Sequence, residues 1–420
     1  MSIDPEEFKR KREEKAQQRQ KNQRVTLVRL VIAGIVLVLC GLLILLLTRP
    51  GSTPKAPAET SGQTTGDTGN TSPLAETVIR LAAVGDLNVT DAVVASGGIG
   101  FDYTNTFLDV AHLLADADIT TVNFEGNLYG APYIDRSAPQ SMMTALQRIG
   151  VDLVQLSNSF SIYKGMHGLA QTIDGVRLAG MEPLGVYPST QEAVSQKGYT
   201  IRSVQGIRIA FVSFTKGMDG MALPAGNEGC VNLLYKDYST DYQEVDTEGI
   251  SRILDAAAKE KPDLTVALLH WGSEFNNTIS QSQKDICRLL QEKGVDAIIG
   301  THSHYVQSMT YDEASGNFVA YSLGDFLGDA TKAGSEYSVI LELEITKQTE
   351  TGETKITDYS YTPIFTVAEE GEPLQVMRIR QAMAAFEEGY IDRISQQTYD
   401  AMTYALQRIE ARVNEKVADE

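Results

Sequence analysis

Short runs of apolar and β-branched residues recur along most of this chain, and polar residues cluster right after them. Runs of about four to eight such residues, with helix-like stretches between them, predict buried strands in an α/β fold. The runs are VIRLAAVG, ITTVNFEG, VDLVQLS, IRIAFVSF, LTVALLHWG, VDAIIG and FVAYSLG, and the first helix-like stretch is FLDVAHLLADA. Ligands of open α/β sheets bind just beyond the carboxyl ends of the strands. We therefore expect a functional site where these runs end.

A longer apolar segment lies near the N-terminus. Leu30 to Thr48 is a run of nineteen residues without a charge, and a helix needs about 20 apolar residues to cross the hydrocarbon layer of a membrane. The apolar core of a cleavable signal peptide is shorter, roughly 7–15 residues. Bulky Leu39 before Cys40 argues against a lipoprotein signal. We predict a retained transmembrane anchor over residues 25–48, which would place Leu30 to Thr48 in the lipid bilayer.

Charge predicts the orientation of this anchor. Residues 1–48 hold nine basic and five acidic residues, and Lys and Arg near a span stay on the cytoplasmic side. We therefore expect a single-pass protein of the cell membrane, with a basic cytoplasmic segment (residues 1–24) and the main domain outside the cytoplasm. Because the first 48 residues contribute +4 to the formal net charge of −19, the rest of the chain carries −23. Such an acidic domain argues against nucleic acid as a partner.

Composition divides the remaining chain into three parts. Residues 49–76 are rich in Thr, Gly, Ser and Pro, which predicts a flexible linker. The α/β pattern fills residues 77–366. The last part, 367–420, is expected to be helical and to pack on the domain or on a partner. One helix is expected around 376–388, and a second carries apolar residues at helical spacing, namely Tyr399, Met402, Leu406, Ile409 and Val413.

Two of the three cysteines lie in the α/β region. Cys230 and Cys287 could pair in an oxidising compartment or remain small buried apolar residues. We favour the second alternative, because two cysteines fix no disulfide pattern.

The polar residues at the strand ends have metal-binding chemistry. Imidazole nitrogens and carboxylate oxygens are the usual ligands of Zn, Mn or Fe. Residues i and i+2 of an extended backbone point the same way, so His302 and His304 can aim at one point, and so can Asp86 and Asn88. We predict a site for one or two divalent ions. Its candidate residues are Asp86, Asn88, Asn123, Glu125, Asn158, His270, Trp271, Glu274, His302, His304 and Asp325.

Each of these features also has a plain structural explanation. Two histidines one residue apart are often structural, and an aspartate after a strand is often a helix N-cap. His270 beside Trp271 can be an ordinary half-buried histidine. The metal hypothesis depends on the polar groups appearing at the same end of successive strands. His112, in a helical pattern, and His167, in a Gly-rich loop, are given no role.

The ordered motifs AAVGDLN, VNFEGNL, LHWGSEF, IIGTHSHYVQ and YSLGDF resemble those of the CapA family, the capsule or poly-γ-glutamate synthesis proteins. The resemblance runs from about Ile79 to Thr366. It implies a metallophosphatase-like fold, a layered α/β/β/α sandwich. It also implies a divalent metal cofactor (Mn, Zn, Fe or Mg), membrane subunits of a polymer synthesis complex as partners, and an anionic polymer as substrate.

The resemblance also implies roles for single residues. Asp86 matches the first ligand aspartate and Glu125 the bridging carboxylate of metallophosphatases. The histidine ligands match His270, His302 and His304. Of these, Asp86, Glu125, His270 and His302 would serve catalysis, and Asn158 would be a further ligand after a small shift of its loop. The side chains that would support the ligands or face the substrate are Asn88, Asn123, Trp271, Glu274 and Asp325.

Two departures from the family pattern matter, one in and just after the stretch Ser157 to Phe160 and one at Asp325. Where the family has Ala-Asn-Asn-His, this chain has Ser157-Asn158-Ser159-Phe160, so Ser159 replaces a ligand and Phe160 replaces the expected acid or transition-state stabiliser. Phenylalanine cannot transfer a proton, and losing a general acid costs about 10²–10⁴-fold in rate. Tyr163 replaces a family aspartate. Asp325 replaces an asparagine and is either a compensating ligand or a surface acid.

Three functions follow from these observations. The first is a membrane-anchored, metal-dependent hydrolase or transferase-like component that acts on a cell-surface polymer. The second is a catalytically degenerate scaffold subunit of a capsule-polymer synthesis or export complex, which the residues Ser159 and Phe160 favour. A plain adhesion domain is the third, but it leaves the strand-end pattern unexplained. An acidic domain that binds a polyanion would need a metal or a local basic groove.

Overall fold

The apolar runs form the inner strands of two β-sheets. The structure, a computed structural model, describes residues 76–330, 332–390 and 393–417. The first sheet has the strand order β14-β13-β12-β1-β2-β3-β4, with β11 paired to β1, and the second has the order β5-β6-β7-β8-β10-β9. The strands of the first sheet are β1 (Glu76–Asn88), β2 (Ile119–Glu125), β3 (Leu153–Gln155), β4 (Glu182–Leu184), β11 (Asp325–Leu327), β12 (Tyr337–Gln348), β13 (Thr354–Val367) and β14 (Gln375–Arg378). Those of the second are β5 (Tyr199–Val204), β6 (Ile207–Thr215), β7 (Leu264–His270), β8 (Ala297–Thr301), β9 (Met309–Asp312) and β10 (Asn317–Ala320).

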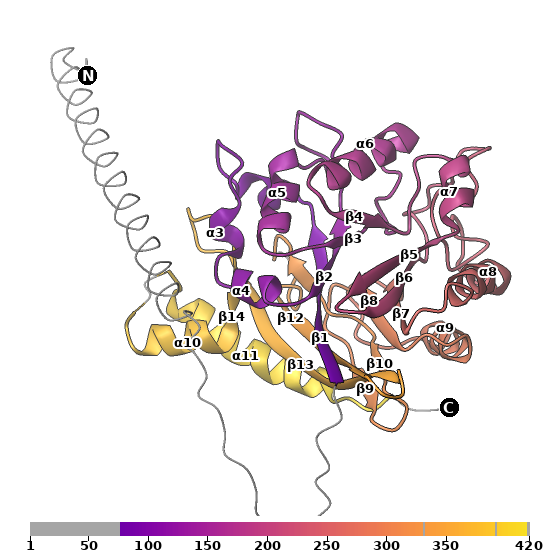
Figure 1. Cartoon of the computed structure of the whole chain (residues 1–420). Helices are drawn as coiled ribbons and strands as arrows, with labels where there is room; N and C mark the ends of the chain where they lie inside the picture. The colour runs from indigo at the N-terminus through magenta and orange to yellow at the C-terminus, as the bar shows by residue number, and fades with distance from the viewer. Residues whose placement is uncertain (1–75, 331, 391–392, 418–420) are drawn as a thin grey trace, which may run out of the picture. The chain divides into compact units, whose positions relative to one another are not determined.

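Helices cover the outer faces of both sheets (Figure 1). On the first sheet these are α2 (Asp91–Ala95), α3 (Thr104–Phe107), α4 (Ala111–Ala115), α5 (Gln140–Arg148) and α6 (Gly165–Leu178). On the second sheet they are α8 (Thr247–Ala258) and α9 (Gln281–Glu292). A short helix, α7 (Thr190–Gln196), buries none of its side chains.

Three apolar layers hold these elements together. One lies between the first sheet and its helices, one between the two sheets, and one between the second sheet and its helices. Successive side chains of a strand point to opposite faces, so Leu81 and Ala83 of β1 face the other sheet while Ala82 and Val84 face the helices. The predicted mixed α/β sandwich is therefore confirmed.

Aspartates fix the amino ends of the parallel strands. Each precedes one strand, and its carboxylate accepts a hydrogen bond of 2.7–2.9 Å from a backbone N–H of the neighbouring strand. The pairs are Asp118 with Arg80, Asp152 with Thr120, Asp263 with Arg208, and Asp296 with Thr265. Since a buried backbone donor must be satisfied, these bonds hold one edge of each sheet in register. The carboxyl ends of the same strands lie at the opposite edge.

The stretch FLDVAHLLADA does not form one helix. It contains the end of α3 and all of α4, with Asp109 in the break between them. The Asp109 carboxylate accepts a 2.7 Å hydrogen bond from the backbone N–H of Arg378, at the end of β14, and further bonds from the Arg378 side chain. This contact with the first sheet accompanies the interruption of the helical pattern.

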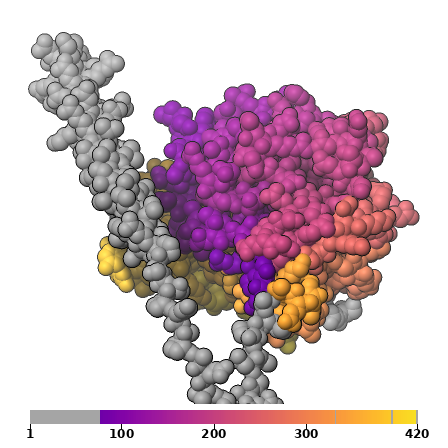
Figure 2. Space-filling view, in the orientation of Figure 1, coloured from indigo at the N-terminus to yellow at the C-terminus, as the bar shows by residue number. Residues whose placement is uncertain are grey.

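The C-terminal part packs on the first sheet. Two helices, α10 (Ile379–Glu387) and α11 (Gln396–Val413), lie against β12, β13 and β14. The α11 residues Met402, Ala405, Ile409 and Val413 are buried in the apolar layer between the sheets. Gly389, with φ of 72°, follows α10 in the left-handed conformation that ends many helices. In the space-filling view, part of this C-terminal region is visible in yellow at the lower edge of the domain (Figure 2).

Some predictions fall outside the described residues. These are the cytoplasmic segment, the anchor over 25–48 and all of the linker except Glu76, which begins β1. Within the part of the chain that the structure does describe, no helix is both long and apolar enough to cross a membrane. Cys230 and Cys287 are free thiols in the structure, and both are buried.

Asp296 provides a test of the strand-start aspartates. Burial raises its pKa to about 6, above the unfolded value of about 3.9. Its contribution to stability is thus present below about pH 4 and lost as the pH rises through about 6. Asp296→Asn keeps an oxygen for the Thr265 N–H but cannot ionise. Between pH 5 and pH 7.5 the variant should lose about 1 kcal/mol less stability than the wild type, as measured by urea unfolding. The exposed Asp241→Asn is the control, and parallel pH profiles for D296N and wild type would contradict the expectation.

Candidate metal centre

The two sheets bring ligand-type side chains together at one edge. Two groups of three residues lie there, and within each group one ligating atom from every residue is within 4.8 Å of the others. The first ligand group is Glu125, His270 and His302, and the second ligand group is Asp86, His304 and Asp325. All six residues are buried. The five ligands predicted from the sequence thus converge, and Asp325 joins them as a buried acid rather than a surface one.

His302 and His304 belong to different groups. β8 ends at Thr301, and both histidines follow in the left-handed conformation, with φ of 88° and 58°. The prediction of an extended backbone through these residues is therefore wrong. The His302 ring centroid lies 4.3 Å from that of His270, whereas the His304 ring stacks on Phe275 at 4.9 Å. Left-handed backbone costs about 1–2 kcal/mol for a residue other than glycine, and here it directs two imidazoles to two neighbouring positions.

The first ligand group contains a buried carboxylate without a hydrogen bond. Glu125 Oε1 lies 3.1 Å from His270 Nε2, yet neither Glu125 oxygen accepts a hydrogen bond from the described residues, and His302 Nδ1 also has no partner among them. Burial, reinforced by the charge of Asp86, raises the pKa of Glu125 well above its usual range. An unpaired buried carboxylate costs several kcal/mol. A divalent cation would satisfy these orphaned atoms, so the residues fit a metal ion.

The histidines of this group are in the ligating form. Burial lowers the pKa of His270 well below its usual value, and the proximity of the His302 and His304 imidazoles further disfavours its protonated form. Burial also lowers the pKa of His302, with the charge of Lys216 as the next cause. Both imidazoles are therefore neutral at physiological pH, and a neutral imidazole has the free lone pair that a metal needs.

The second ligand group is held by an ion pair. His304 Nδ1 lies 2.7 Å from Asp325 Oδ1 and 3.8 Å from Asp86 Oδ2. Burial alone would lower the pKa of His304, but Asp325 and the other carboxylates outweigh it and raise the pKa to about 10. Burial raises the pKa of Asp325 to about 6, against the effect of His304. At neutral pH the pair is an imidazolium and a carboxylate, and a metal bound here would replace the imidazolium proton.

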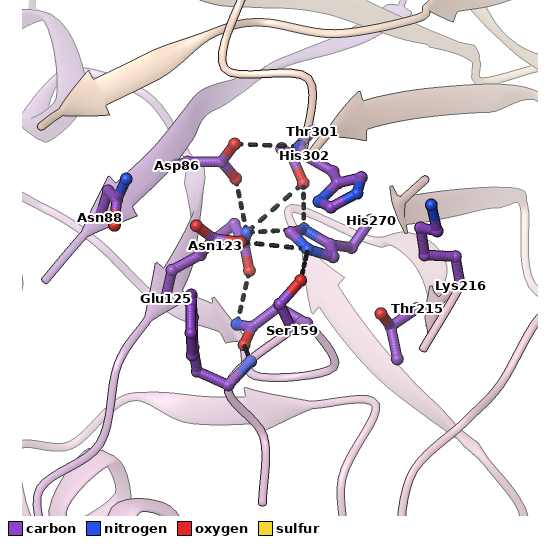
Figure 3. Close-up of polar contacts among 12 residues, drawn as sticks. Asp86, Asn88, Asn123, Glu125, Ser159, Thr215, Lys216, His270, Thr301 and His302 are labelled. Carbon is purple, nitrogen blue, oxygen red and sulfur yellow. Dashed lines mark hydrogen bonds and ion pairs between the residues drawn. The ribbon is translucent and has the colours of Figure 1, made fainter. Parts of the chain in front are cut away.

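Hydrogen bonds join the two groups (Figure 3). Asn123 Nδ2 donates to Asp86 Oδ1 at 2.5 Å, and the backbone N–H of His302 donates to Asp86 Oδ2 at 3.0 Å. His270 Nδ1 lies 3.3 Å from Thr301 Oγ1 and 3.3 Å from Asn123 Nδ2. Burial raises the pKa of Asp86, and these donors oppose the rise. The network therefore orients Asp86 of the second group and His270 of the first group through their shared neighbour Asn123.

A close backbone approach places Asp86 beside Asp325. The two residues pair in register where β1 and β11 run parallel, and the Asp86 N–H donates to the Gly324 carbonyl at 3.0 Å. A Cβ on Gly85 would lie 1.8 Å from that same carbonyl oxygen. Glycine at position 85 is therefore required for this part of the site.

Asn158 supports the site but is not placed as a ligand. Its Nδ2 donates to Asn123 Oδ1 at 3.0 Å and to the Phe124 carbonyl at 2.8 Å. Its Oδ1 accepts a hydrogen bond of 3.0 Å from the Phe160 N–H. The predicted shift of Asn158 into the ligand set does not occur, because its amide groups already hold Asn123 and the following loop.

Ser159 and Phe160, two of the residues that depart from the family pattern, differ in position. Ser159 is buried, and its Oγ lies 3.1 Å from His270 Nε2, the same nitrogen that faces Glu125. Phe160 is half-buried, with the Arg136 guanidinium 4.2 Å from its ring centroid and the Tyr163 ring at its edge. Ser159 thus contacts a residue of the first ligand group, whereas Phe160 lies in the surroundings of that group.

Trp271 is part of the core rather than of the site. Its Nε1 donates to the Tyr321 carbonyl at 2.8 Å, and its ring stacks on the Tyr321 ring at 5.7 Å. It packs in the apolar layer under α8 and α9. Asn88 accepts a hydrogen bond from Arg136 and does not point to the same place as Asp86, unlike the sequence prediction.

A cavity of about 260 Å³ adjoins the first ligand group. Ser159, His302, Lys216, Tyr242 and the predicted Glu274 are among its lining residues. Lys216 Nζ donates to the Gly272 carbonyl at 2.8 Å and lies 4.4 Å from the Tyr242 ring centroid, and burial lowers its pKa. The sequence reasoning missed Lys216, although it directly follows β6 and the strand-end rule applies to it. Arg136 was also missed, and its loop position gave no signal.

Comparisons with known proteins agree on one family. The family model described as bacterial capsule synthesis protein PGA_cap matches residues 80–330. The chain is 25% identical over 256 residues to the capsule biosynthesis protein CapA of Bacillus anthracis, covering 59% of this chain and 58% of that protein. It is 24% identical over 212 residues to the PGA biosynthesis protein CapA of Bacillus subtilis (strain 168), covering 50% and 51%. The chain thus spans between half and three fifths of the length of these relatives.

Among solved structures, the calcineurin-like phosphoesterase YfkN from Bacillus subtilis aligns with a TM-score of 0.40 at 14% identity. The alignment covers 79% of this chain and all of that one (100%).

If the first ligand group binds a metal, one substitution, Glu125→Gln, should have opposite effects on stability with and without the metal. Glu125→Gln removes a buried acid whose pKa is raised well above its usual range, and with it the free-energy cost of burying that ionisable group, so the chelator-treated variant should be more stable than wild type. Mn²⁺ at about 100 times its Kd should stabilise wild type by about 2.7 kcal/mol and E125Q far less. Thermal unfolding of the full chain and elemental analysis measure both effects. His167→Ala, which removes an exposed histidine, is the control, and wild type without bound metal or metal-dependent stability would contradict the assignment.

The second ligand group can be tested on its own. Asp325→Asn removes the carboxylate that pairs with His304 but leaves the first ligand group intact. If the second group binds its own ion, D325N should weaken the second metal equivalent by more than about 10-fold and keep the first. Calorimetric titration with Mn²⁺ separates the two equivalents. Equal loss of both, or of neither, would contradict two distinct positions.

Proposed function

The chain belongs to the bacterial capsule synthesis family PGA_cap, and we propose that it is a membrane-anchored member that acts on a cell-surface polymer through a divalent metal site. The curated relatives are named for capsule biosynthesis and for PGA biosynthesis. The proposed activity is metal-dependent hydrolysis or group transfer, with a capsule polymer or poly-γ-glutamate as the substrate.

The observation that carries this proposal is the buried Glu125 carboxyl group, which accepts no hydrogen bond from the described residues and lies in one group with two neutral imidazoles. Glu125, His270 and His302 would hold one ion, and Asp86, His304 and Asp325 a second. A bound divalent metal supplies polarisation of a phosphoryl or carbonyl oxygen and lowers the pKa of a coordinated water to about 7. Mn, Zn, Fe and Mg are all candidates for the ion.

The chain's own residues would prepare and orient this site. Asn123 holds one oxygen of Asp86, and Thr301 and Ser159 lie beside the two nitrogens of His270. Lys216 places a cation in the cavity beside His302. Although the domain is acidic, an anionic group in that cavity would meet a positive charge.

The second candidate function is a scaffold subunit without catalysis. Phe160 cannot transfer a proton and Ser159 is a poor metal ligand, so the site would keep a metal for structure or polymer binding. The chain would then act with membrane subunits of a polymer synthesis or export complex. The position of Phe160 beside the first ligand group is the observation that favours this function.

Anchoring by Leu30 to Thr48, with the main domain outside the cytoplasm, is part of both proposals. It depends on the uncharged apolar run and on the basic residues that precede it. Cell fractionation with protease treatment of intact cells tests it. Recovery of the chain in the soluble fraction would contradict the prediction. So would a chain that protease added to intact cells does not cleave.

A gain-of-function experiment separates the two candidate functions. Full chain with Mn²⁺ is assayed on bis-p-nitrophenyl phosphate and on poly-γ-glutamate, beside E125Q and the control H167A. If the chain is an enzyme, wild type turns over one substrate, and E125Q loses at least about 100-fold because it lacks the charged ligand.

If the chain is a scaffold, wild type should be inactive while still binding metal. The double variant Ser159→Asn, Phe160→His restores the family residues and should then gain activity by about 10²-fold or more. Activity in wild type that E125Q retains would contradict a role of the metal site in the reaction.

A further inference from the structure

We propose that Arg136, held on the face of Phe160, is an anion-binding residue of the candidate metal centre and contacts the anionic group of its substrate. The inference rests on the proposed function, because it assigns a substrate contact at that same site. It also supplies the local positive charge that an acidic domain needs in order to bind an anion.

Arg136 contacts both segments that border the first ligand group. Its guanidinium carbon lies 4.2 Å from the Phe160 ring centroid, and Nη1 donates to Asn88 Oδ1. Phe160 follows Ser159, which lies against His270, and Asn88 pairs in register with Glu125. The charge of Arg136 is also close enough to favour the ionised form of Glu125. These contacts place one cation at the rim of the first ligand group.

The backbone at Arg136 is strained. Asp135 and Arg136 are consecutive left-handed residues, with φ of 52° and 65°, and each costs about 1–2 kcal/mol relative to ordinary backbone. The Arg136 carbonyl accepts two hydrogen bonds of 2.8 Å from Asn127, which hold this conformation. Glycine would adopt it with less strain. An arginine side chain at such a position points to a function of the side chain.

The guanidinium keeps donors available for a ligand. Arginine has five N–H donors, and among the described residues the contacts of this side chain are Asn88 and Phe160. The neighbouring Asp135 carboxylate does not occupy these donors, because its Oδ2 lies 3.8 Å from Lys164 Nζ. Arg136 and Phe160 are both half-buried, so a ligand from solvent can reach them. A planar guanidinium matches two oxygens of a phosphate or a carboxylate.

Arginine supplies charge but no proton. A guanidinium is not deprotonated in proteins, so Arg136 would bind and neutralise an anion without replacing the proton transfer of a histidine. Both enzyme and scaffold can use such a contact. The assignment is therefore independent of which of the two proposed functions holds.

Binding of inorganic phosphate to the full chain tests the assignment. Calorimetric titrations are made on the chelator-treated chain and on the Mn²⁺-loaded chain, with glutarate as a second probe that carries carboxylates. Arg136→Met should weaken phosphate binding by at least about 10-fold, the loss of a charged hydrogen bond. Arg136→Lys should lose less than R136M, because it keeps the charge without the planar fork.

Two further variants separate the role of Arg136 from general charge. Phe160→Ala removes the ring that carries the guanidinium and should weaken binding by about two- to five-fold. Lys164→Met removes one positive charge from the same surface and should change binding by less than about two-fold. Thermal unfolding checks that each variant is folded, and R136M and R136K keep the Cβ that the strained backbone already accommodates.

The outcomes are distinct. Loss of phosphate or glutarate binding in R136M but not in K164M supports the assignment, and the tighter probe shows whether a phosphate or a carboxylate is the preferred anion. Wild-type affinity in R136M, equal losses in R136M and K164M, or no binding of either probe to wild type would overturn it. If the chain binds no Mn²⁺, the metal proposal fails, yet R136M-sensitive binding by the chelator-treated chain would still support Arg136.

Discussion

The burial of three carboxylates in one region constrains the rest of this structure. Asp86, Glu125 and Asp325 are all almost inaccessible to solvent, and like charges in a medium of low polarity repel strongly. One imidazolium, His304, offsets part of this charge, and the Asn123 amide donates to Asp86. Glu125 accepts no hydrogen bond from the described residues, and burial raises its pKa well above the usual range despite the nearby charge of His304. A bound cation, as proposed here, would offset the free-energy cost of this arrangement.

The two sheets allow several strands to contribute carboxylates to this one region. Aspartates such as Asp118 and Asp263 satisfy backbone donors where the parallel strands begin, so the strands enter both sheets in a fixed register. The carboxyl ends of these strands then meet at one edge. There the chain leaves the sheets, and the side chains are free to form a site. The same strand polarity therefore places structural carboxylates at one edge and the carboxylates of the candidate metal centre at the other.

The sequence correctly located the site residues that lie at strand ends. It failed for the residues whose side-chain positions depend on the conformation of the following loop. His270 is the last residue of β7 and Glu125 the last of β2, so periodicity alone located them. His304 was predicted to share one point with His302, but left-handed backbone beyond β8 sends the two rings to different groups. Asn158 offers ligand chemistry in the sequence, yet its amide is committed to neighbours that only the folded loop brings close.

Arg136 shows why charge composition and local charge lead to different conclusions. The chain beyond the predicted anchor carries −23, which by itself disfavours a polyanionic ligand. Over more than a Debye length, about 8 Å at physiological ionic strength, exposed charges are largely screened, so a ligand at the site responds mainly to its nearest groups. Those groups include Arg136 on Phe160 and Lys216 in the adjoining cavity. A net acidic domain with Arg136 and Lys216 beside the ligand groups would disfavour polyanions in general while offering positive charge at the site.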